Sequence, residues 1–283
     1  MRYIFVGEGG KEDIGKTEHY TELGWELMVT RLAFIRDLNL GIWNKDDTVV
    51  TLSDRKFLYS KLCNVVSTSD FNSEPNDTVF HYSDGADFID YVKMVKTLED
   101  LHGKYMKGLT NNYQHISDKP QILDIDYEDV ETKYNIKDSF VGMLVRTRGW
   151  CPERNTNENE AKEMLNKLLT MYKKVFIFGL GSKHLADGER IIYLDTLREW
   201  ASVMHSKFCD FIIGVGSGGS MICQLCCNSA LLLIPNGGPI CQRHPLFYSS
   251  SVTFSNLKIL LGTSSSQILN YVEENCKNHN KPQ

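Results

Sequence analysis

The chain has 283 residues and a mass of 32.3 kDa, which suits two domains of about 130 to 150 residues each. Hydrophobic residues make up 42% of the chain and charged residues 24%, as in ordinary globular proteins. The formal net charge of −5 and the pI near 5.9 argue against a nucleic-acid-binding or membrane-surface protein, because both classes usually carry a basic field.

The N-terminus does not resemble a secretory signal peptide, since the apolar residues 1–6 are too few and run into Gly-Glu-Gly-Gly. No apolar run is long enough to span a bilayer, so we expect no transmembrane segment. Eight cysteines without a secretory signal are expected to be reduced thiols. These features predict a cytoplasmic protein, and nothing in the sequence indicates its oligomeric state.

The first half of the chain alternates predicted strands and helices. The predicted strands are residues 2–6, 48–52 and 65–66, and the predicted helices are residues 25–41, 54–62 and 87–106. The last of these helices shows an amphipathic stripe. Such an alternation predicts a parallel sheet with helices packed on it.

The regular pattern breaks down between residues 108 and 139. This stretch contains Asn-Asn, Asp-Lys-Pro and an acidic run at residues 124–131, although residues 121–125 could form an edge strand. The change in composition predicts an interdomain connection. We therefore expect an N-terminal α/β domain over residues 1–120 and a C-terminal α/β domain over residues 121–283.

The second half repeats the rhythm more clearly. Its predicted strands are residues 140–145, 175–178, 191–194, 211–215, 231–234 and 257–261, and its predicted helices are residues 157–172, 197–205 and 220–227, with a closing helix that ends at residue 275. In parallel α/β sheets, ligands bind at the carboxyl ends of the strands, and a cleft between two such domains would collect both sets of loops.

One turn in this half has the features of an anion site. The strand at residues 211–215 is followed by Gly216, Ser217, Gly218 and Gly219, and a helix is expected to begin at Ser220. Backbone N–H groups at a helix start have no intrahelical partner, and glycine lets a phosphate approach the main chain. The alternative interpretation is a tight turn that needs glycine only for its dihedral angles.

The strand at residues 140–145 ends at a cluster of three arginines, Arg146, Arg148 and Arg154, which is unusual in an acidic protein. Guanidinium groups suit bidentate binding of phosphate, and Arg146 and Arg148 would point to one side of a continuing strand. Surface ion pairs are the alternative. Gly179 and Ser182, in a Gly-Leu-Gly-Ser run after another strand, could line a nucleoside pocket or form a plain turn.

On these residues the second half, from about residue 140 to residue 235, resembles the donor-binding domain of GT-B glycosyltransferases. The resemblance implies two Rossmann-like domains with parallel sheets facing across a cleft. In that family a strand-end cation and a Gly/Ser-rich helix start hold the diphosphate of a sugar nucleotide, and Arg146, Arg148 and residues 216–220 match those positions. The small size is similar to glycosyltransferases of large DNA viruses and some bacteria.

The resemblance implies transfer of a sugar from a UDP- or GDP-linked donor to a glycan hydroxyl, with no other cofactor. Because no acidic donor-ribose motif is evident, an inverting, metal-independent reaction is expected. The general base is expected in the loop after the first strand, with Asp13 as first choice and His19 next. Gly9, Gly10 and Trp150 are the expected acceptor-binding positions.

A competing motif occupies the same loop. Residues 10–17, Gly-Lys-Glu-Asp-Ile-Gly-Lys-Thr, satisfy the P-loop pattern and follow a predicted strand, which would indicate a kinase or NTPase. Against this, the carboxylates of Glu12 and Asp13 would crowd the phosphates. A non-catalytic nucleotide-binding regulator is a third possibility.

A zinc site is a weaker alternative. Cys223 with Cys226 and Cys241 with His244 have zinc-like internal spacing. However, Cys223 and Cys226 lie in a predicted helix rich in apolar residues, where cysteine behaves as a small apolar side chain. We therefore expect no metal site.

Overall fold

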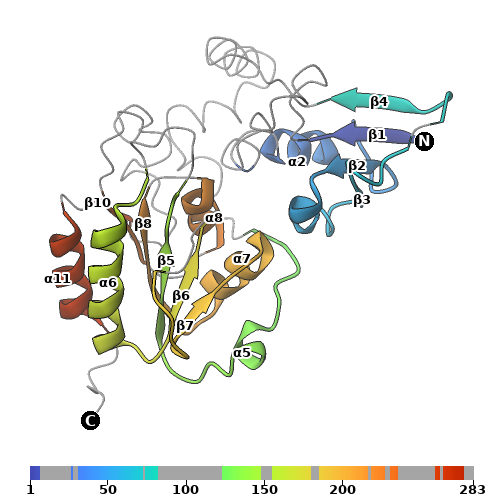
Figure 1. Cartoon of the computed structure of the whole chain (residues 1–283). Coiled ribbons are helices and arrows are strands. Elements are labelled where there is room, and N and C mark those ends of the chain that lie inside the picture. Colours follow the sequence, from blue (N-terminus) through green and yellow to red (C-terminus); the bar gives the residue numbers. More distant parts are fainter. Residues whose placement is uncertain are drawn as a thin grey trace. The chain divides into compact units, whose positions relative to one another are not determined.

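The computed structural model of the chain (Figure 1) describes residues 1–6, 27, 31–72, 74–81, 123–147, 155–179, 185–215, 218–226, 230–234, 259–261 and 264–276. The chain divides into two compact units, of which one comprises Met1–Asp118 with Leu123–Asp126 and the other Lys119–Ile122 with Tyr127–Gln283. The predicted domain boundary between residues 120 and 121 lies outside the described residues and stays a prediction.

The first unit contains a four-stranded parallel sheet in the order β3-β2-β1-β4. Its strands are β1 (Arg2–Phe5), β2 (Thr48–Thr51), β3 (Asn64–Ser67) and β4 (Thr78–His81). Strand β4 was not predicted, because its four residues show too short a pattern to stand out from the polar residues before it. It pairs with β1 along its whole length and so completes the sheet.

Two helical segments of the first unit are described. Helix α2 is Arg31–Asn39, and the chain leaves it through Gly41 at φ 74°, a left-handed conformation that suits glycine and explains the predicted stop. The helix predicted over residues 54–62 is wrong in type and length, because the structure has a 3₁₀ helix, η3 (Ser53–Leu58). The helix predicted over residues 87–106 lies outside the described residues.

Leu123 and Ile125 lie in the predicted connection, and their side chains are 2% and 1% exposed. The described part of the predicted edge strand, residues 123–125, belongs to neither sheet. The alternation of apolar and polar residues there therefore serves burial rather than strand pairing.

The second unit is built on a six-stranded parallel sheet in the order β10-β9-β8-β5-β6-β7. Its strands are β5 (Phe140–Leu144), β6 (Val175–Phe178), β7 (Ile191–Tyr193), β8 (Cys209–Val215), β9 (Ala230–Ile234) and β10 (Ile259–Leu261). Counted along the chain, this is the 3-2-1-4-5-6 order of dinucleotide-binding folds. The order reverses between β5 and β8, which are hydrogen-bonded neighbours.

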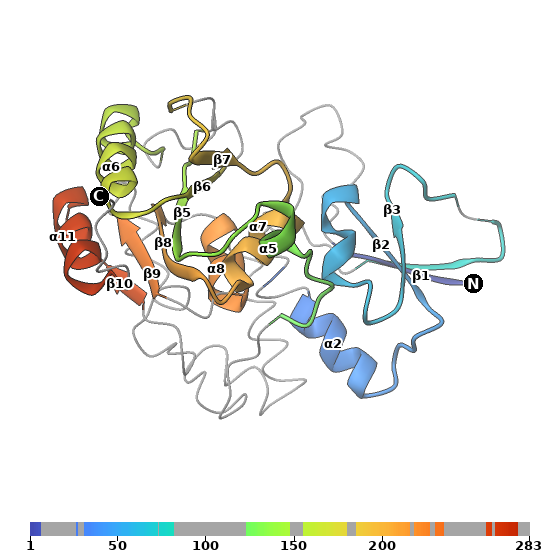
Figure 2. The ribbon, with the colours of Figure 1, turned by 90° about the horizontal axis from the view of Figure 1, so that it is seen from below.

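Helices cover both faces of this sheet (Figures 1 and 2), with α6 and α11 on one face and α7 and α8 on the other. The helices are α5 (Val130–Lys133), α6 (Glu158–Met171), α7 (Leu197–His205), α8 (Gly218–Cys226) and α11 (Ser265–Asn275). Four residues of α6 at spacings of three and four are buried against the sheet: Ala161, Met164, Leu165 and Leu168.

Glu199 connects α5 to the first turn of α7. Its Oε1 accepts hydrogen bonds from Lys133 Nζ at 2.5 Å and from Tyr134 Oη at 2.7 Å. Its Oε2 accepts from the backbone of Asp195 at 3.2 Å and of Thr196 at 3.3 Å, which forms a capping box with Thr196. Burial alone would raise the pKa of Glu199, but these bonds outweigh it and lower the pKa to about 2.

Glu199→Gln is expected to reduce the free energy of unfolding at neutral pH by about 1 to 3 kcal/mol, because a charge-assisted network is lost. Since the folded pKa of Glu199, about 2, lies below its ordinary value of 4.5, the stabilisation is present above that value and is lost as the pH falls toward 2. Urea denaturation at neutral pH and at about pH 3 measures this difference. If the difference in unfolding free energy between the wild type and Glu199→Gln were the same at both pH values, the lowered pKa of Glu199 would be contradicted.

Candidate functional site

The carboxyl ends of β5 and β8 lie side by side at the point where the strand order reverses. The register runs from Val141 opposite Phe211 to Leu144 opposite Gly214. Arg146 follows β5 directly, and the Gly/Ser-rich turn follows β8. Two segments that are about 70 residues apart in the sequence therefore leave neighbouring strands at one edge of the sheet, where α/β proteins bind ligands.

Arg146 is buried, with 5% of its surface exposed. Its Nη1 donates a hydrogen bond to Asn155 Oδ1 at 2.6 Å. Its backbone N–H donates to Thr156 Oγ1, and the Thr156 N–H donates back to the Arg146 carbonyl, both at 2.9 Å. These bonds of Arg146 close the base of the loop between β5 and α6. They also place a buried positive charge at the start of that loop. Arg148, Arg154 and Trp150 lie outside the described residues.

Two glycines near the turn pack closely against Leu144. A Cβ at Gly214 would lie 2.6 Å from Leu144 Cβ, and a Cβ at Gly219 would lie 2.8 Å from Leu144 Cδ1. Helix α8 begins at Gly218, two residues before the predicted start, and the Ser220 side chain is fully buried. Packing therefore accounts for Gly214, whereas the Leu144 methyl group near Gly219 can move aside.

Gly216 and Gly218 are the two other glycines of the predicted anion site. Gly218 opens α8, so its N–H group belongs to the positive end of the helix. Gly216 and Ser217 lie outside the described residues.

Gly179, which we expected to line the nucleoside pocket, directly follows β6 and lies next to the backbone of Val145. Its φ is 157°, and a Cβ there would lie 1.6 Å from the Val145 carbonyl oxygen. Glycine is thus required by the close approach of the two strand ends. Ser182 lies outside the described residues.

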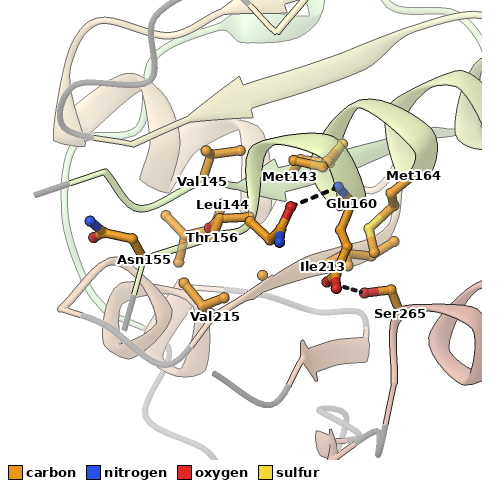
Figure 3. Close-up of a pocket in the computed structure, with 13 residues that line it drawn as sticks. Met143, Leu144, Val145, Asn155, Thr156, Glu160, Met164, Ile213, Val215 and Ser265 are labelled. Atoms are coloured by element: carbon orange, nitrogen blue, oxygen red, sulfur yellow. Dashed lines mark hydrogen bonds between the residues drawn. The ribbon is translucent and has the colours of Figure 1, made fainter. Parts of the chain in front are cut away.

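A cavity of about 170 Å³ opens at this edge (Figure 3), between β5, β8 and the first turns of α6 and α11. Its apolar lining residues are Met143, Leu144, Val145, Ala161, Met164, Ile213 and Val215. Its polar lining residues are Asn155, Thr156, Asn157, Glu160 and Ser265. Sequence reasoning missed this cavity, because periodicity places residues on a helix face but does not show where two helix ends meet.

Two helix N-termini meet at the cavity. Asn157 caps α6 by accepting hydrogen bonds from the N–H groups of Asn159 at 3.0 Å and Glu160 at 3.2 Å. Ser264 caps α11 by accepting from the Gln267 N–H at 3.2 Å. Glu160 Oε2 accepts from Ser265 Oγ at 3.1 Å, which ties the two first turns together (Figure 3).

The predicted residues of the N-terminal loop, Gly9, Gly10, Asp13 and His19, lie outside the described residues, as does the P-loop-like segment 10–17. Strand β1, which precedes the loop, lies between β2 and β4 at the centre of its sheet. The loop therefore begins where the strand order of the first sheet reverses, a position that also suits ligand binding.

Of the four residues in the zinc-like spacing, Cys223 and Cys226 are buried on α8, and Cys223 Sγ donates to the Gly219 carbonyl at 3.2 Å. Cys241 and His244 lie outside the described residues. Within the described ranges, no group of three or more His, Cys, Asp or Glu side chains could hold a metal ion, and no helix is long and apolar enough to cross a membrane.

Neither protein-family models nor curated protein sequences match the chain. Among solved structures, it is similar to the ADP-heptose LPS heptosyltransferase II of E. coli, with a TM-score of 0.52, 11% identity and coverage of 97% of this chain and 98% of that one. E. coli heptosyltransferase WaaC with ADP has a TM-score of 0.47, 13% identity and coverage of 98% and 100%. A family 9 glycosyl transferase from Veillonella parvula has a TM-score of 0.47, 11% identity and coverage of 99% and 91%.

At 11% identity, the likeness to heptosyltransferase II shows the fold alone. Together with the two parallel sheets, it confirms the predicted fold class, a GT-B-like α/β protein.

Proposed function

We propose that the chain is a glycosyltransferase that moves a sugar from a nucleoside-diphosphate sugar to a hydroxyl of a glycan acceptor. The adjacency of β5 and β8 carries the proposal, because it brings Arg146 and the helix-start turn to one edge of a sheet. The fold likeness to a heptosyltransferase named for ADP-heptose supports a sugar nucleotide as donor.

In this proposal the second unit binds the donor. Arg146, Arg148 and the N–H groups of residues 216–220 hold the diphosphate, and residues 179–182 face the nucleoside. Guanidinium groups and a helix N-terminus suit this role because negative charge develops on the departing nucleoside diphosphate. No metal is required in this scheme, since the protein supplies the positive charge.

In the same proposal, Gly9, Gly10 and Trp150 bind the acceptor. The acceptor oxygen attacks the anomeric carbon and forms the new C–O bond as the bond to the diphosphate oxygen breaks, with inversion. Asp13, or else His19, takes the acceptor proton, and the bond electrons leave with the nucleoside diphosphate.

The location is also part of the proposal. The structure shows no disulfide at the five cysteines among the described residues. Because reduced thiols are typical of the cytosol, we place the enzyme in the cytoplasm.

Thermal denaturation with UDP, GDP and ADP, and with a sugar nucleotide of each, tests this function. The ligands that carry one of the three bases are expected to stabilise the protein without magnesium, by about 2.7 kcal/mol at a ligand concentration of about 100 times Kd. The sugar nucleotide with that base should then be consumed in the presence of a glycan acceptor. Stabilisation only by ATP with magnesium would favour the P-loop alternative, and binding without turnover would favour a regulator.

A further inference from the structure

Among the described residues that line the cavity at the carboxyl ends of β5 and β8, one is charged, Glu160. We propose that this cavity takes a neutral sugar ring of the donor, and that Glu160 accepts hydrogen bonds from two neighbouring hydroxyls of that ring. The inference rests on the proposed function and names what part of the donor this cavity binds. The ring is either the ribose of the nucleotide or the sugar that is transferred.

The position of Glu160 supports a binding role. It lies in the first turn of α6 and is exposed at the rim of the cavity, where its Oε2 accepts from Ser265 Oγ at 3.1 Å (Figure 3). A carboxylate can accept about four hydrogen bonds, and Ser265 supplies one of them. The carboxylate therefore keeps capacity for two ligand hydroxyls.

The charge of the lining indicates a neutral ring. Glu160 is the only ionisable side chain among the described residues that line the cavity. A carboxylate or phosphate on the ring would meet a like charge, and the described lining holds no cation to offset it. A hydroxyl edge instead meets acceptors and donors at Glu160, Asn157 and Ser265.

Size and composition favour a sugar ring over a nucleobase. About 170 Å³ is well below the roughly 300 Å³ at which pockets for whole drug-sized ligands begin, so the cavity admits one ring. The described lining has no aromatic side chain on which a base would stack, whereas Met143, Met164 and Ile213 offer aliphatic contact for the C–H face of a sugar.

The cavity also adjoins the proposed diphosphate site. Asn155 lines the cavity and accepts the hydrogen bond from Arg146 at 2.6 Å. A sugar ring in the cavity would thus lie next to a positive charge, and both sugars of the donor are attached directly to the diphosphate. In this arrangement Glu160 binds the hydroxyls of the sugar ring, and Arg146, at a separate position, binds the diphosphate.

The full-length variant Glu160→Gln tests the proposal, with binding of ADP, UDP, GDP and their sugar nucleotides measured by calorimetry. We expect the ligand that binds the wild type to bind this variant at least about tenfold more weakly, since hydrogen bonds to a charged acceptor are lost. Glu158→Gln is the matched control: Glu158 is also in the first turn of α6, but it pairs with Lys162 and does not line the cavity. It should bind like the wild type.

The set of ligands for which Glu160→Gln loses affinity identifies the ring that the cavity binds. A loss already present with the free nucleoside diphosphate, and absent with its 2′-deoxy form, assigns the ribose. A loss seen only with the sugar nucleotide assigns the transferred sugar. Equal binding by Glu160→Gln and the wild type would overturn the cavity proposal alone, whereas a wild type that binds none of these ligands would overturn the proposed function and this inference together.

Discussion

Gly179→Ala is expected to lower the free energy of unfolding by at least about 3 kcal/mol, the largest effect of any single substitution considered. A Cβ at this position would lie 1.6 Å from the Val145 carbonyl oxygen, well inside van der Waals contact. The obstacle is backbone, so no side-chain rotation relieves it. The φ of 157° adds strain for any residue with a Cβ.

The clash lies at the end of β5 and β6, where the Val145 N–H donates to the Phe178 carbonyl at 2.8 Å. We therefore expect the variant to open this edge of the sheet before the rest of the unit. Gly188→Ala is the control, because a Cβ there meets only Ile191 at 3.6 Å, an ordinary contact. Chemical denaturation of both variants measures the difference, and a loss below about 1 kcal/mol in Gly179→Ala would show that the strand ends are not this close.

Arg146→Met is expected to weaken binding of the nucleoside diphosphate by about 100-fold or more, because it removes the buried positive charge next to the proposed diphosphate site. Methionine keeps most of the length of the arginine side chain, so the loss of nucleotide affinity should come from the missing charge and not from a change in packing. Arg146→Lys keeps the charge and should recover part of the affinity. Isothermal titration calorimetry of the three proteins measures these affinities.

Arg190→Met is the matched control, with the same change of charge and size. Arg190 donates to the carbonyls of Lys173, Leu169 and Tyr172 at the C-terminus of α6, the end away from the cavity. It is expected to lose stability and keep nucleotide affinity. If Arg146→Met kept its affinity, Arg146 would have only the structural role shown by its bond to Asn155.

Local periodicity sufficed for elements with a complete pattern. The predicted bounds of β6 and α7 match the structure, and α6 begins and ends within one residue of its prediction. These elements bury a regular stripe or a continuous apolar run, which a sequence displays directly. The four-residue β4 shows too little pattern to be recognised, and η3 shows that a helix-like spacing does not distinguish 3₁₀ from α geometry.

The candidate site could be predicted only in part. Residues at strand ends could be named, but the pairing of β5 with β8 depends on which strands neighbour each other, a property of the whole sheet. Glu160 and Ser265 are separated by 105 positions, so their contact has no local signal. The burial of Arg146 and the approach of Gly179 to Val145 depend on packing that no spacing rule contains.

Hydrogen–deuterium exchange of the wild-type protein, with and without the nucleoside diphosphate that stabilises it, tests the central claim most directly. We expect the ligand to slow exchange at residues 144–157 and 214–220, the segments that follow β5 and β8. Slowed exchange confined to residues 7–20, around the P-loop-like segment, would contradict a donor site on the six-stranded sheet.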